Sequence, residues 1–596
     1  MAGLVNMKAK DYEDGLKILE DITSNAHEIQ EKVLEDILRR NSGTEYLKGF
    51  LNGQIDKQLF KKNVPIVTYE DIKPYMDRIA NGEPSNILLA EPITGFFRSG
   101  TSGGQAKLIP STAEFILEKF ALFLTMTASV VKKHVHGFEH GKRIYFMFGK
   151  PEIETPSGLM ARSVSTSYFK SINFAKTVSE NHTNPIETVL CPDSKQSMFC
   201  QLLAGLIHRD EVVSIGSFSL SAVVRTIKFL EDHWKELCFN IETGHVSDWI
   251  NDSGCRTAMS LILKPDPKLA NSLEMICCSK SWEGIIQKLW PKTKFIDAIA
   301  TGGMGQYVTA LNFYSGGLPI VSPFYASSEA LFGINLEPLN KPSDVSYTFL
   351  PNMAYFEFIP VEKDDGEEVQ FNGVSDQEHP IETKHKDEDT EPVDLVNVTP
   401  GQYYEVVVTT SSGLYRYRVG DILMATGFHN NSPQFQFVER KNVILSIDAD
   451  KTSESDLIKA VEEAKALLDP VDLLLIGFSS YADTSSIPGH YAVFWELKTK
   501  QGDDVKELDP EIMVQCCSIM EESLSYIYKV YRKENAIAAL EIRVVKNGSF
   551  DALMDYFVSQ GASMNQYKAP SCIKTKEAVE ILNSRVTGRF FSQKTF

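Results

Sequence analysis

Three glycines and three hydroxyl residues fall within the eight positions from 97 to 104, directly after an apolar segment. Glycines allow successive backbone N–H groups to converge on an anion, and the hydroxyls of Ser99, Thr101 and Ser102 add further donors. The segment therefore suits a phosphate cradle. It is not a Walker A loop, because Lys107 follows too late. A solvent-exposed turn is the alternative interpretation.

A second polar group, Phe-Tyr-Ala-Ser-Ser-Glu at 324–329, follows a short apolar run at 318–322. If the run is a buried strand, the group lies at its carboxyl end, where ligands of α/β proteins tend to bind. Tyr325 would then offer a stacking face, the two serines phosphate donors, and Glu329 a magnesium ligand. The alternative is an ordinary helix start capped by Ser327 or Ser328.

A third group alternates tyrosine and arginine from 415 to 418 and ends in Gly420-Asp421. This pattern suits a strand that delivers the Asp421 carboxylate to a cleft, where it could accept hydrogen bonds from both hydroxyls of a ribose. A surface strand with cross-strand charge pairs explains the same residues equally well.

Hydrophobic patterning indicates how these groups are positioned. Amphipathic spacing predicts an all-helical lead-in at 11–52. Short apolar runs predict buried strands that alternate with helices, which is typical of an α/β fold. The strands are expected at 143–148, 295–300 and 318–322, and the helices at 196–208 and 222–238.

The pattern restarts near residue 437, which predicts a large N-terminal domain at 1–436 and a smaller α/β domain at 437–596. Ser453 with Asp456 three residues on predicts a capped helix start. In the smaller domain we expect helices at 453–467, 510–532 and 549–559, and strands at 443–447, 472–478, 490–498 and 540–546.

Charge and composition exclude several classes of protein. The net charge of −19 argues against nucleic-acid binding. Residues 362–394 hold 13 acidic and 3 basic residues, so we expect an acidic, flexible insertion between two strands. The nine cysteines include no C-x-x-C pair and no histidine at zinc-like spacing, which predicts reduced, mostly buried thiols. Without a membrane span or signal pattern, we expect a cytoplasmic protein with no membrane partner.

Taken in order, the three polar groups resemble those of adenylate-forming, firefly-luciferase-like enzymes, and in particular the plant auxin-responsive acyl-acid amido synthetases of the Gretchen Hagen family. The similarity runs over nearly the whole chain. It includes further segments at 64–71, 156–162, 346–348, 352–358 and 561–570.

The resemblance implies a large multi-subdomain N-terminal domain with a mobile C-terminal domain, and a monomer-like ligase that acts in plant hormone homeostasis. Such an enzyme uses ATP and Mg²⁺ to adenylate a small carboxylic acid, indole-3-acetic acid or a benzoate. It then conjugates the acid to an amino acid and releases AMP and pyrophosphate.

The resemblance also assigns roles to individual residues. Phosphates of ATP would contact Ser99, Thr101 and Ser102, and Asp421 would bind the ribose. The adenine and α-phosphate would lie among Tyr325, Ala326, Ser327 and Ser328, with Glu329 holding Mg²⁺. Lys451 and Lys568 would be the catalytic residues, one of them neutralising phosphate charge. The acyl pocket would be lined by Phe123, Thr127, Val130, Arg162 and Tyr168.

Several positions depart from the family pattern. Arg98 replaces a usual serine beside Ser99, and would either reinforce phosphate binding or obstruct the nucleotide site. Gly302-Gly303 and Ser571 are further departures near the substrates. Thr127 falls where benzoate-preferring relatives have an arginine and indole-acetate-preferring ones an aliphatic residue, so the acid stays open. An acyl-CoA ligase and a catalytically impaired, ligand-binding homologue are the alternative functions.

Overall fold

The computed structural model describes residues 12–99, 107–137, 140–149, 152–361, 391–440, 443–447, 450–500, 508–565 and 567–596. The chain begins with the expected all-helical lead-in, which is confirmed by α1, α2 and α3. The first five helices are α1 (Tyr12–Ser24), α2 (Ala26–Asn41), α3 (Glu45–Leu51), α4 (Lys57–Asn63) and α5 (Tyr69–Ala80).

A small sheet follows, in which β1 (Gly95–Arg98) forms an antiparallel hairpin with β2 (Leu108–Ser111). Its order is β2-β1-β5-β4, and it includes the only strands before residue 142 in the described part of the chain. The remaining members are β4 (Ile153–Glu154) and β5 (Met160–Arg162), and the neighbouring helices are α6 (Ala113–His134), α7 (Val164–Phe169) and α8 (Ile172–Asn181).

A four-stranded parallel sheet, in the order β3-β6-β7-β8, forms the second layer. The strands predicted from apolar runs are confirmed here, as are the two predicted helices α10 and α11. The strands are β3 (Lys142–Phe146), β6 (Val212–Ser219), β7 (Phe295–Ile299) and β8 (Ile320–Val321). The helices are α9 (Ile186–Leu190), α10 (Ser194–Ile207), α11 (Leu220–Thr243), α12 (Ser253–Ile262), α13 (Pro267–Cys277), α14 (Ile285–Leu289) and α15 (Val308–Ser315).

Only Ser322 and Pro323 separate β8 from β9 (Phe324–Ala326), which belongs to a different, eight-stranded sheet. The group 324–329 therefore follows the carboxyl end of β8, as expected, but its first three residues form a strand of the other sheet. The alternative of a helix start is wrong, because β9 turns directly into the antiparallel strand β10 (Leu331–Ile334). Hydrogen bonding fixes this link: the Ser322 hydroxyl accepts from Ala300 N, and Asn335 Nδ2 donates to the Ser322 carbonyl.

All pairs in the eight-stranded sheet are antiparallel, in the order β13-β12-β14-β15-β16-β11-β10-β9. Its remaining strands are β11 (Tyr347–Phe349), β12 (Tyr355–Val361), β13 (Val393–Asp394), β14 (Tyr403–Thr409), β15 (Tyr417–His429) and β16 (Ser432–Arg440). Most of the acidic segment 362–394 lies outside the described residues, and its flexibility stays a prediction. The sheet extends to Arg440, past the predicted domain boundary at residue 436. The two-domain division also stays a prediction.

The C-terminal region contains a hairpin and a four-stranded sheet in the order β19-β20-β21-β22. Ser453 caps its first helix, as expected, by accepting from Asp456 N. The elements are β17 (Val443–Ile447), β18 (Asp450–Ser453), α16 (Glu454–Lys465), β19 (Leu473–Asp483), β20 (His490–Thr499), α17 (Pro510–Ser523), α18 (Tyr526–Lys533), β21 (Glu541–Val545), α19 (Ser549–Ser559), α20 (Lys576–Asn583) and β22 (Val586–Phe591).

The single helix predicted at 510–532 is wrong, because the structure has two helices there. Leu524 ends α17 in an extended conformation, and the Ser525 hydroxyl accepts from Tyr528 N to start α18. A local cap therefore overrides the apolar periodicity that runs through both helices.

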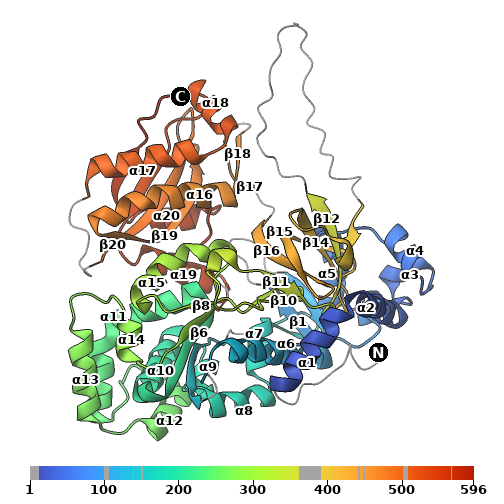
Figure 1. Cartoon of the computed structure of the whole chain (residues 1–596), viewed down its shortest axis with the longest axis horizontal. Coiled ribbons are helices and arrows are strands. Elements are labelled where there is room, and N and C mark those ends of the chain that lie inside the picture. The colour runs from blue at the N-terminus through green and yellow to red at the C-terminus, as the bar shows by residue number, and fades with distance from the viewer. Residues whose placement is uncertain are drawn as a thin grey trace.

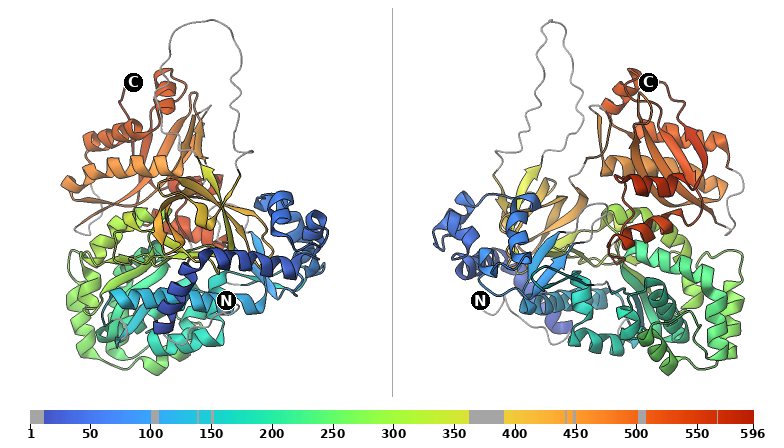
Figure 2. Two further views of the ribbon diagram at one scale, coloured as in Figure 1. Left: turned by 45° about the vertical axis from the view of Figure 1, so that its right-hand side comes forward. Right: turned by 180° about the vertical axis from the view of Figure 1, so that it is seen from behind.

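The C-terminal region packs on the helices that cover the parallel sheet, and lies above them in Figure 1 and in both views of Figure 2. One hydrophobic core contains residues of both parts, including Leu311 of α15 and Phe494 of β20. Helix α11 adds ion pairs along one face: Arg225 with Asp555, Lys228 with Glu496, and Glu231 with Lys498, at 2.6, 2.9 and 2.6 Å.

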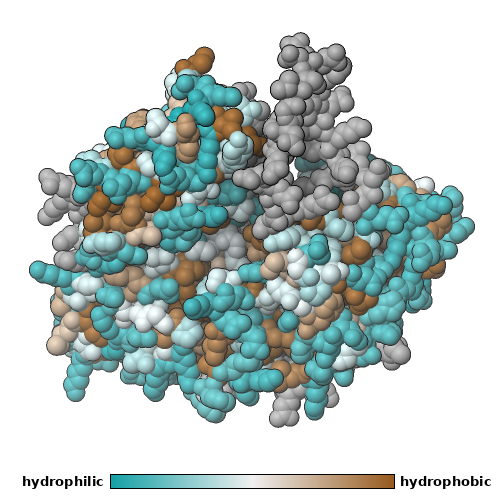
Figure 3. Space-filling view, turned by 45° about the horizontal axis from the view of Figure 1, so that its top comes forward, coloured by the Kyte–Doolittle hydropathy of each residue, from teal (hydrophilic) through white to brown (hydrophobic). Residues whose placement is uncertain are grey.

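No helix in the described part of the chain has the length and apolar character needed to cross a membrane. On the face drawn in Figure 3, hydrophobic residues are scattered among hydrophilic ones.

One buried ion pair anchors the start of β15. The Arg416 guanidinium donates to both carboxylate oxygens of Glu357 on β12, at 2.9 and 3.0 Å, and to the carbonyls of Lys61 and Val64. Both side chains are buried, and Arg416 adopts a left-handed conformation with φ of 48°. The antiparallel sheet is thereby tied to the end of α4.

We expect Arg416→Met to destabilise the protein by about 3–5 kcal/mol, because it leaves the Glu357 carboxylate buried without a partner. Thermal and urea unfolding measure the effect. Arg39→Met is the control, because its exposed pair with Glu35 contributes less than about 1 kcal/mol. Equal stability of the two variants would contradict the anchoring role.

Candidate functional site

The Asp421 carboxylate joins three strands of the antiparallel sheet. One oxygen accepts from the Tyr325 hydroxyl of β9 at 2.5 Å, and the other accepts from Arg440 Nε of β16 at 2.7 Å. Asp421 is 2% exposed, and the attraction of its charge raises the pKa of Arg440. Each oxygen keeps a second lone pair, so the carboxylate can still accept hydroxyl groups of a ligand.

The Tyr325 ring lies within a group of aromatic side chains. It stacks on Phe332 with centroids 4.4 Å apart and meets the edge of Phe437 at 6.0 Å. Burial and then the neighbouring Asp421 raise the pKa of its hydroxyl far above the ordinary value, so the hydroxyl remains a donor. An adenine would have to stack on the face of the ring that Phe332 does not cover.

Ser99 is connected to Glu329 through Lys107. The Ser99 hydroxyl accepts from Lys107 N at 3.0 Å. The Lys107 ammonium donates to the Tyr417 hydroxyl at 2.8 Å and lies 3.7 Å from a Glu329 oxygen. Sequence reasoning set Lys107 aside because of its spacing, whereas the β1–β2 hairpin returns it to the side of Ser99. Thr101 and Ser102 lie outside the described residues.

The turn between β9 and β10 carries the predicted serines and Glu329. Ser327 N donates to the Ala330 carbonyl at 2.9 Å, and the Ser327 hydroxyl accepts from Glu329 N at 3.2 Å. The Glu329 side chain is 10% exposed. A carboxylate beside hydroxyl groups offers oxygen ligands of the kind that Mg²⁺ accepts, so these residues fit that ion, although the Lys107 ammonium 3.7 Å away would have to share the carboxylate with it. Ser328 and Ala326 belong to the same hairpin.

Lys568 lies at the contact between the two parts of the chain. Its ammonium is 3.2 Å from Glu454 of α16, which also accepts from the Ser571 hydroxyl at 2.6 Å. Burial alone would raise the pKa of Glu454, but Lys568 and Ser571 hold it below its ordinary value. A Cβ at Gly303 would lie 2.8 Å from the Lys568 nitrogen, so glycine there permits this approach. Lys451 lies in β18, and its side chain is outside the described part.

The predicted acyl-pocket residues of α6 share one helix face. Phe123, Thr127 and Val130 are all buried, and Phe123 contacts Phe324 of β9 with ring centroids 5.5 Å apart. The Thr127 hydroxyl donates to the Phe123 carbonyl at 2.8 Å, so its own helix satisfies it.

The two other predicted pocket residues come from separate elements. Tyr168 of α7 contacts Phe120 of α6, with ring centroids 4.9 Å apart. Arg162 Nε of β5 lies 2.8 Å from a Glu152 oxygen in an ion pair. The structure thus brings Tyr168 to α6, whereas the Arg162 charge is already paired.

Models of the GH3 family match three consecutive parts of the chain: its N-terminal domain at residues 15–320, its central domain at 347–440 and its C-terminal domain at 455–577. The chain belongs to the GH3 family.

Several characterised relatives match over their whole length. Indole-3-acetic acid-amido synthetase GH3.17 of Arabidopsis thaliana is 54% identical over 594 residues, which is 98% of this chain and 97% of the relative. The 4-substituted benzoates-glutamate ligase GH3.12 of the same plant is 50% identical, over 97% and 98%. The solved structure of the GH3.15 acyl acid amido synthetase superposes with a TM-score of 0.88 at 48% identity, covering 99% of each chain.

Arg98 of this GH3 protein faces the C-terminal domain. A Cβ at Gly561 would lie 2.7 Å from an Arg98 guanidinium nitrogen, and Gly561 has a φ of 95° just after the end of α19. Within the described residues Arg98 has no ion-pair or hydrogen-bond partner, and burial lowers the pKa of its guanidinium. The cation therefore lies between the end of β1 and the C-terminal domain, and the described residues provide no compensating anion.

We expect Arg98→Ser to raise the KM for ATP about tenfold, because a charge-assisted hydrogen bond to a phosphate contributes about 1.5–3 kcal/mol. Initial-rate kinetics measure the change, and Arg98→Lys, which keeps the charge, should recover part of it. A faster Arg98→Ser enzyme would mean instead that the arginine obstructs the nucleotide.

Proposed function

We propose that this GH3 enzyme joins an aryl carboxylic acid, of the indole-acetate or benzoate type, to an amino acid through an acyl adenylate. Membership of the family, with about half the sequence identical over the full length, makes the chain an amide-forming acid–amino-acid ligase. The Ser99–Lys107–Glu329 connection supports the proposal most directly, because it joins hydroxyl, ammonium and carboxylate groups suited to a nucleoside triphosphate.

In the proposed first step, Ser99 and the Ser327–Ser328 turn bind the phosphates of ATP, and Asp421 accepts the ribose hydroxyls. Mg²⁺ held by Glu329 would supply neutralisation of phosphate charge. The acid carboxylate attacks the α-phosphorus in line, the bond to the bridging oxygen breaks, and pyrophosphate leaves. Lys568 stabilises the developing charge as a point cation. Lys451, the other lysine assigned by the resemblance, shares this role in the proposal.

In the proposed second step, the amine of the amino acid attacks the acyl carbonyl, the bond to AMP breaks, and the amine releases a proton to solvent. Placement of the two reactants provides much of the acceleration. Lys568 acts in the first step and belongs to the C-terminal domain. In the proposal this domain turns between the two steps and carries Lys568 with it.

The proposed acid is an aryl acid without a charged ring substituent. Phe123, Val130 and Tyr168 are apolar or aromatic, and the Thr127 hydroxyl is already bonded within its helix. Because Arg162 is paired with Glu152, these residues offer no uncompensated cation to a charged substituent. A monomeric state and a cytoplasmic location stay predictions.

Incubation of the purified enzyme with ATP, MgCl₂, a panel of aryl acids and the twenty amino acids tests the function. We expect mass spectrometry to detect an amide conjugate together with equimolar AMP, and no product when CoA replaces the amino acid. A thioester with CoA would favour an acyl-CoA ligase. The absence of both AMP and conjugate would favour a catalytically impaired protein that only binds its ligand.

Lys568→Ala is expected to slow pyrophosphate release by about 100-fold, equivalent to about 2.7 kcal/mol of lost transition-state stabilisation. Lys576→Ala, whose ammonium is exposed, is the matched control and should leave the rate unchanged. An unchanged rate in Lys568→Ala would remove Lys568 from the adenylation step.

Asp421→Asn should raise the KM for ATP by about tenfold or more, because the amide loses the charge that faces Arg440 and accepts hydroxyls less well. Tyr325→Phe removes only the hydroxyl that donates to Asp421, so its effect on the KM should be smaller. The reverse order of effects would contradict a ribose-binding role for Asp421.

A further inference from the structure

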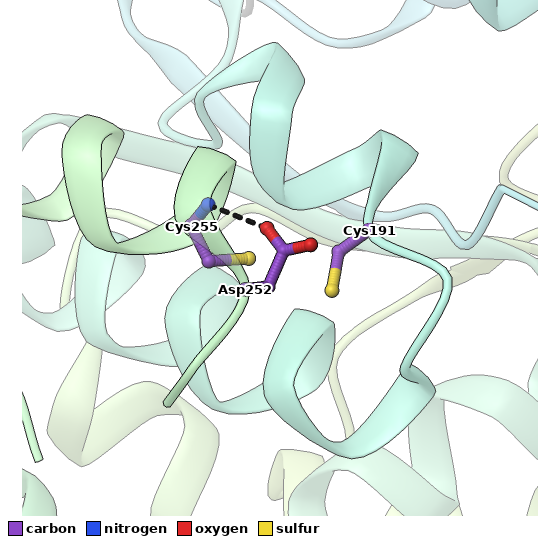
Figure 4. A group of neighbouring side chains, drawn as sticks. All are labelled: Cys191, Asp252 and Cys255. Carbon is purple, nitrogen blue, oxygen red and sulfur yellow. Dashed lines mark hydrogen bonds between the residues drawn. The ribbon is translucent and has the colours of Figure 1, made fainter. Parts of the chain in front are cut away.

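Cys191 lies far in the sequence from Asp252 and Cys255, but the fold brings its thiol to their side chains at the start of α12. The sulfur atoms of Cys191 and Cys255 and a carboxylate oxygen of Asp252 all lie within 4.8 Å of one another (Figure 4). Cys191 lies just before α10, and its side chain and that of Cys255 are 3% and 0% exposed. Sequence spacing gave no sign of this group, because the tertiary fold alone brings the two cysteines together.

The carboxylate is held in place by its surroundings. One Asp252 oxygen accepts from Cys255 N at 2.8 Å, and Figure 4 shows the carboxylate between the two sulfur atoms. The Gln196 side chain accepts from the backbone N–H groups of Asn251 and Asp252 at 2.8 and 2.9 Å. Such supporting hydrogen bonds are typical of metal sites, where they orient the ligands.

Charge distinguishes this group from the other candidate cluster in the described structure, Asp483, His490 and Glu541. There, Arg543 lies 2.6 Å from Asp483 and 2.5 Å from Glu541, so the carboxylates are already neutralised. Within the described residues Asp252 has no lysine or arginine partner. A cation would therefore be repelled at the second cluster and attracted at the first.

We propose that Cys191, Cys255 and Asp252 form a structural zinc site. Two thiolates and a carboxylate are ligands that Zn²⁺ accepts in tetrahedral geometry, and sulfur selects it over Mg²⁺ or Ca²⁺. Water or the fully buried Cys200 of α10, whose thiol interacts with Cys255, would complete the coordination. The ion would connect the loop before α10 to the start of α12.

Zinc binding at this site must release protons. The hydrogen bond to Cys255, followed by burial, raises the pKa of the Cys191 thiol, and the pKa of Cys255 is also raised. A thiol that coordinates the ion gives its proton to solvent.

Titration of the reduced, chelator-treated full-length protein with Co²⁺ tests the proposal. We expect one equivalent of cobalt to produce a thiolate-to-cobalt charge-transfer absorbance that Zn²⁺ abolishes. Cys191→Ser and Cys255→Ser should lose this absorbance. The control Cys278→Ser, which removes an exposed cysteine, should keep it. Asp252→Asn should weaken binding at least about tenfold, while asparagine preserves the helix cap.

Unchanged circular dichroism and thermal unfolding in the absence of metal would show that the variants are folded. No absorbance in the wild-type protein, or absorbance that persists in both Cys191→Ser and Cys255→Ser, would overturn the site. Recovery of the wild-type chain with a Cys191–Cys255 disulfide, and with no cobalt bound after reduction, would overturn it as well. The ligase assay is independent of all these readouts, so failure here leaves the proposed function standing.

Discussion

The burial of one negative charge, that of Asp421, constrains much of this molecule. A buried carboxylate without partners is costly, so its two oxygens hold Tyr325 and Arg440 in fixed positions. Tyr325 lies in β9 and Arg440 in β16, which are the first and the last strands of the eight-stranded sheet in sequence order. Because Arg440 is also the last residue of that sheet, the same charge fixes where the chain leaves for the C-terminal region.

The contact between the two parts of the chain combines a shared apolar core with charge pairs along α11. Arg225, Lys228 and Glu231 lie three residues apart and so share one helix face. Lys498 is buried at this contact and the Lys228 side chain is only 11% exposed, so their pairs are largely shielded from solvent. The face carries two positive charges followed by one negative charge, and this order fixes one register of the C-terminal region against the helix, which apolar contacts alone would specify less sharply.

Regular periodicity predicted the elements that are buried in a uniform way, such as β3, β7, α10 and α11. It failed where local bonding decides the outcome: the Ser525 cap divides one predicted helix into two, and the β9–β10 hairpin after β8 was not foreseen. For the site, the types and order of residues identified Tyr325, Glu329 and Asp421. The structure joins Tyr325 and Asp421 by a hydrogen bond and places Glu329 in the turn between β9 and β10. Arg440 was missed because it meets Asp421 through the pairing of β15 with β16, and Lys107 because its partners Tyr417 and Glu329 belong to another sheet, distant in the sequence.

The two-residue link between β8 and β9 also has a mechanical consequence. Ser322 forms hydrogen bonds with the backbone of residue 300 and with the side chain of Asn335, so the link is rigid rather than a hinge. The strand that carries Tyr325 must therefore follow every displacement of the parallel sheet. A residue inserted in this link would turn each later side chain of β9 to the opposite face, so the link tolerates substitutions better than changes in length.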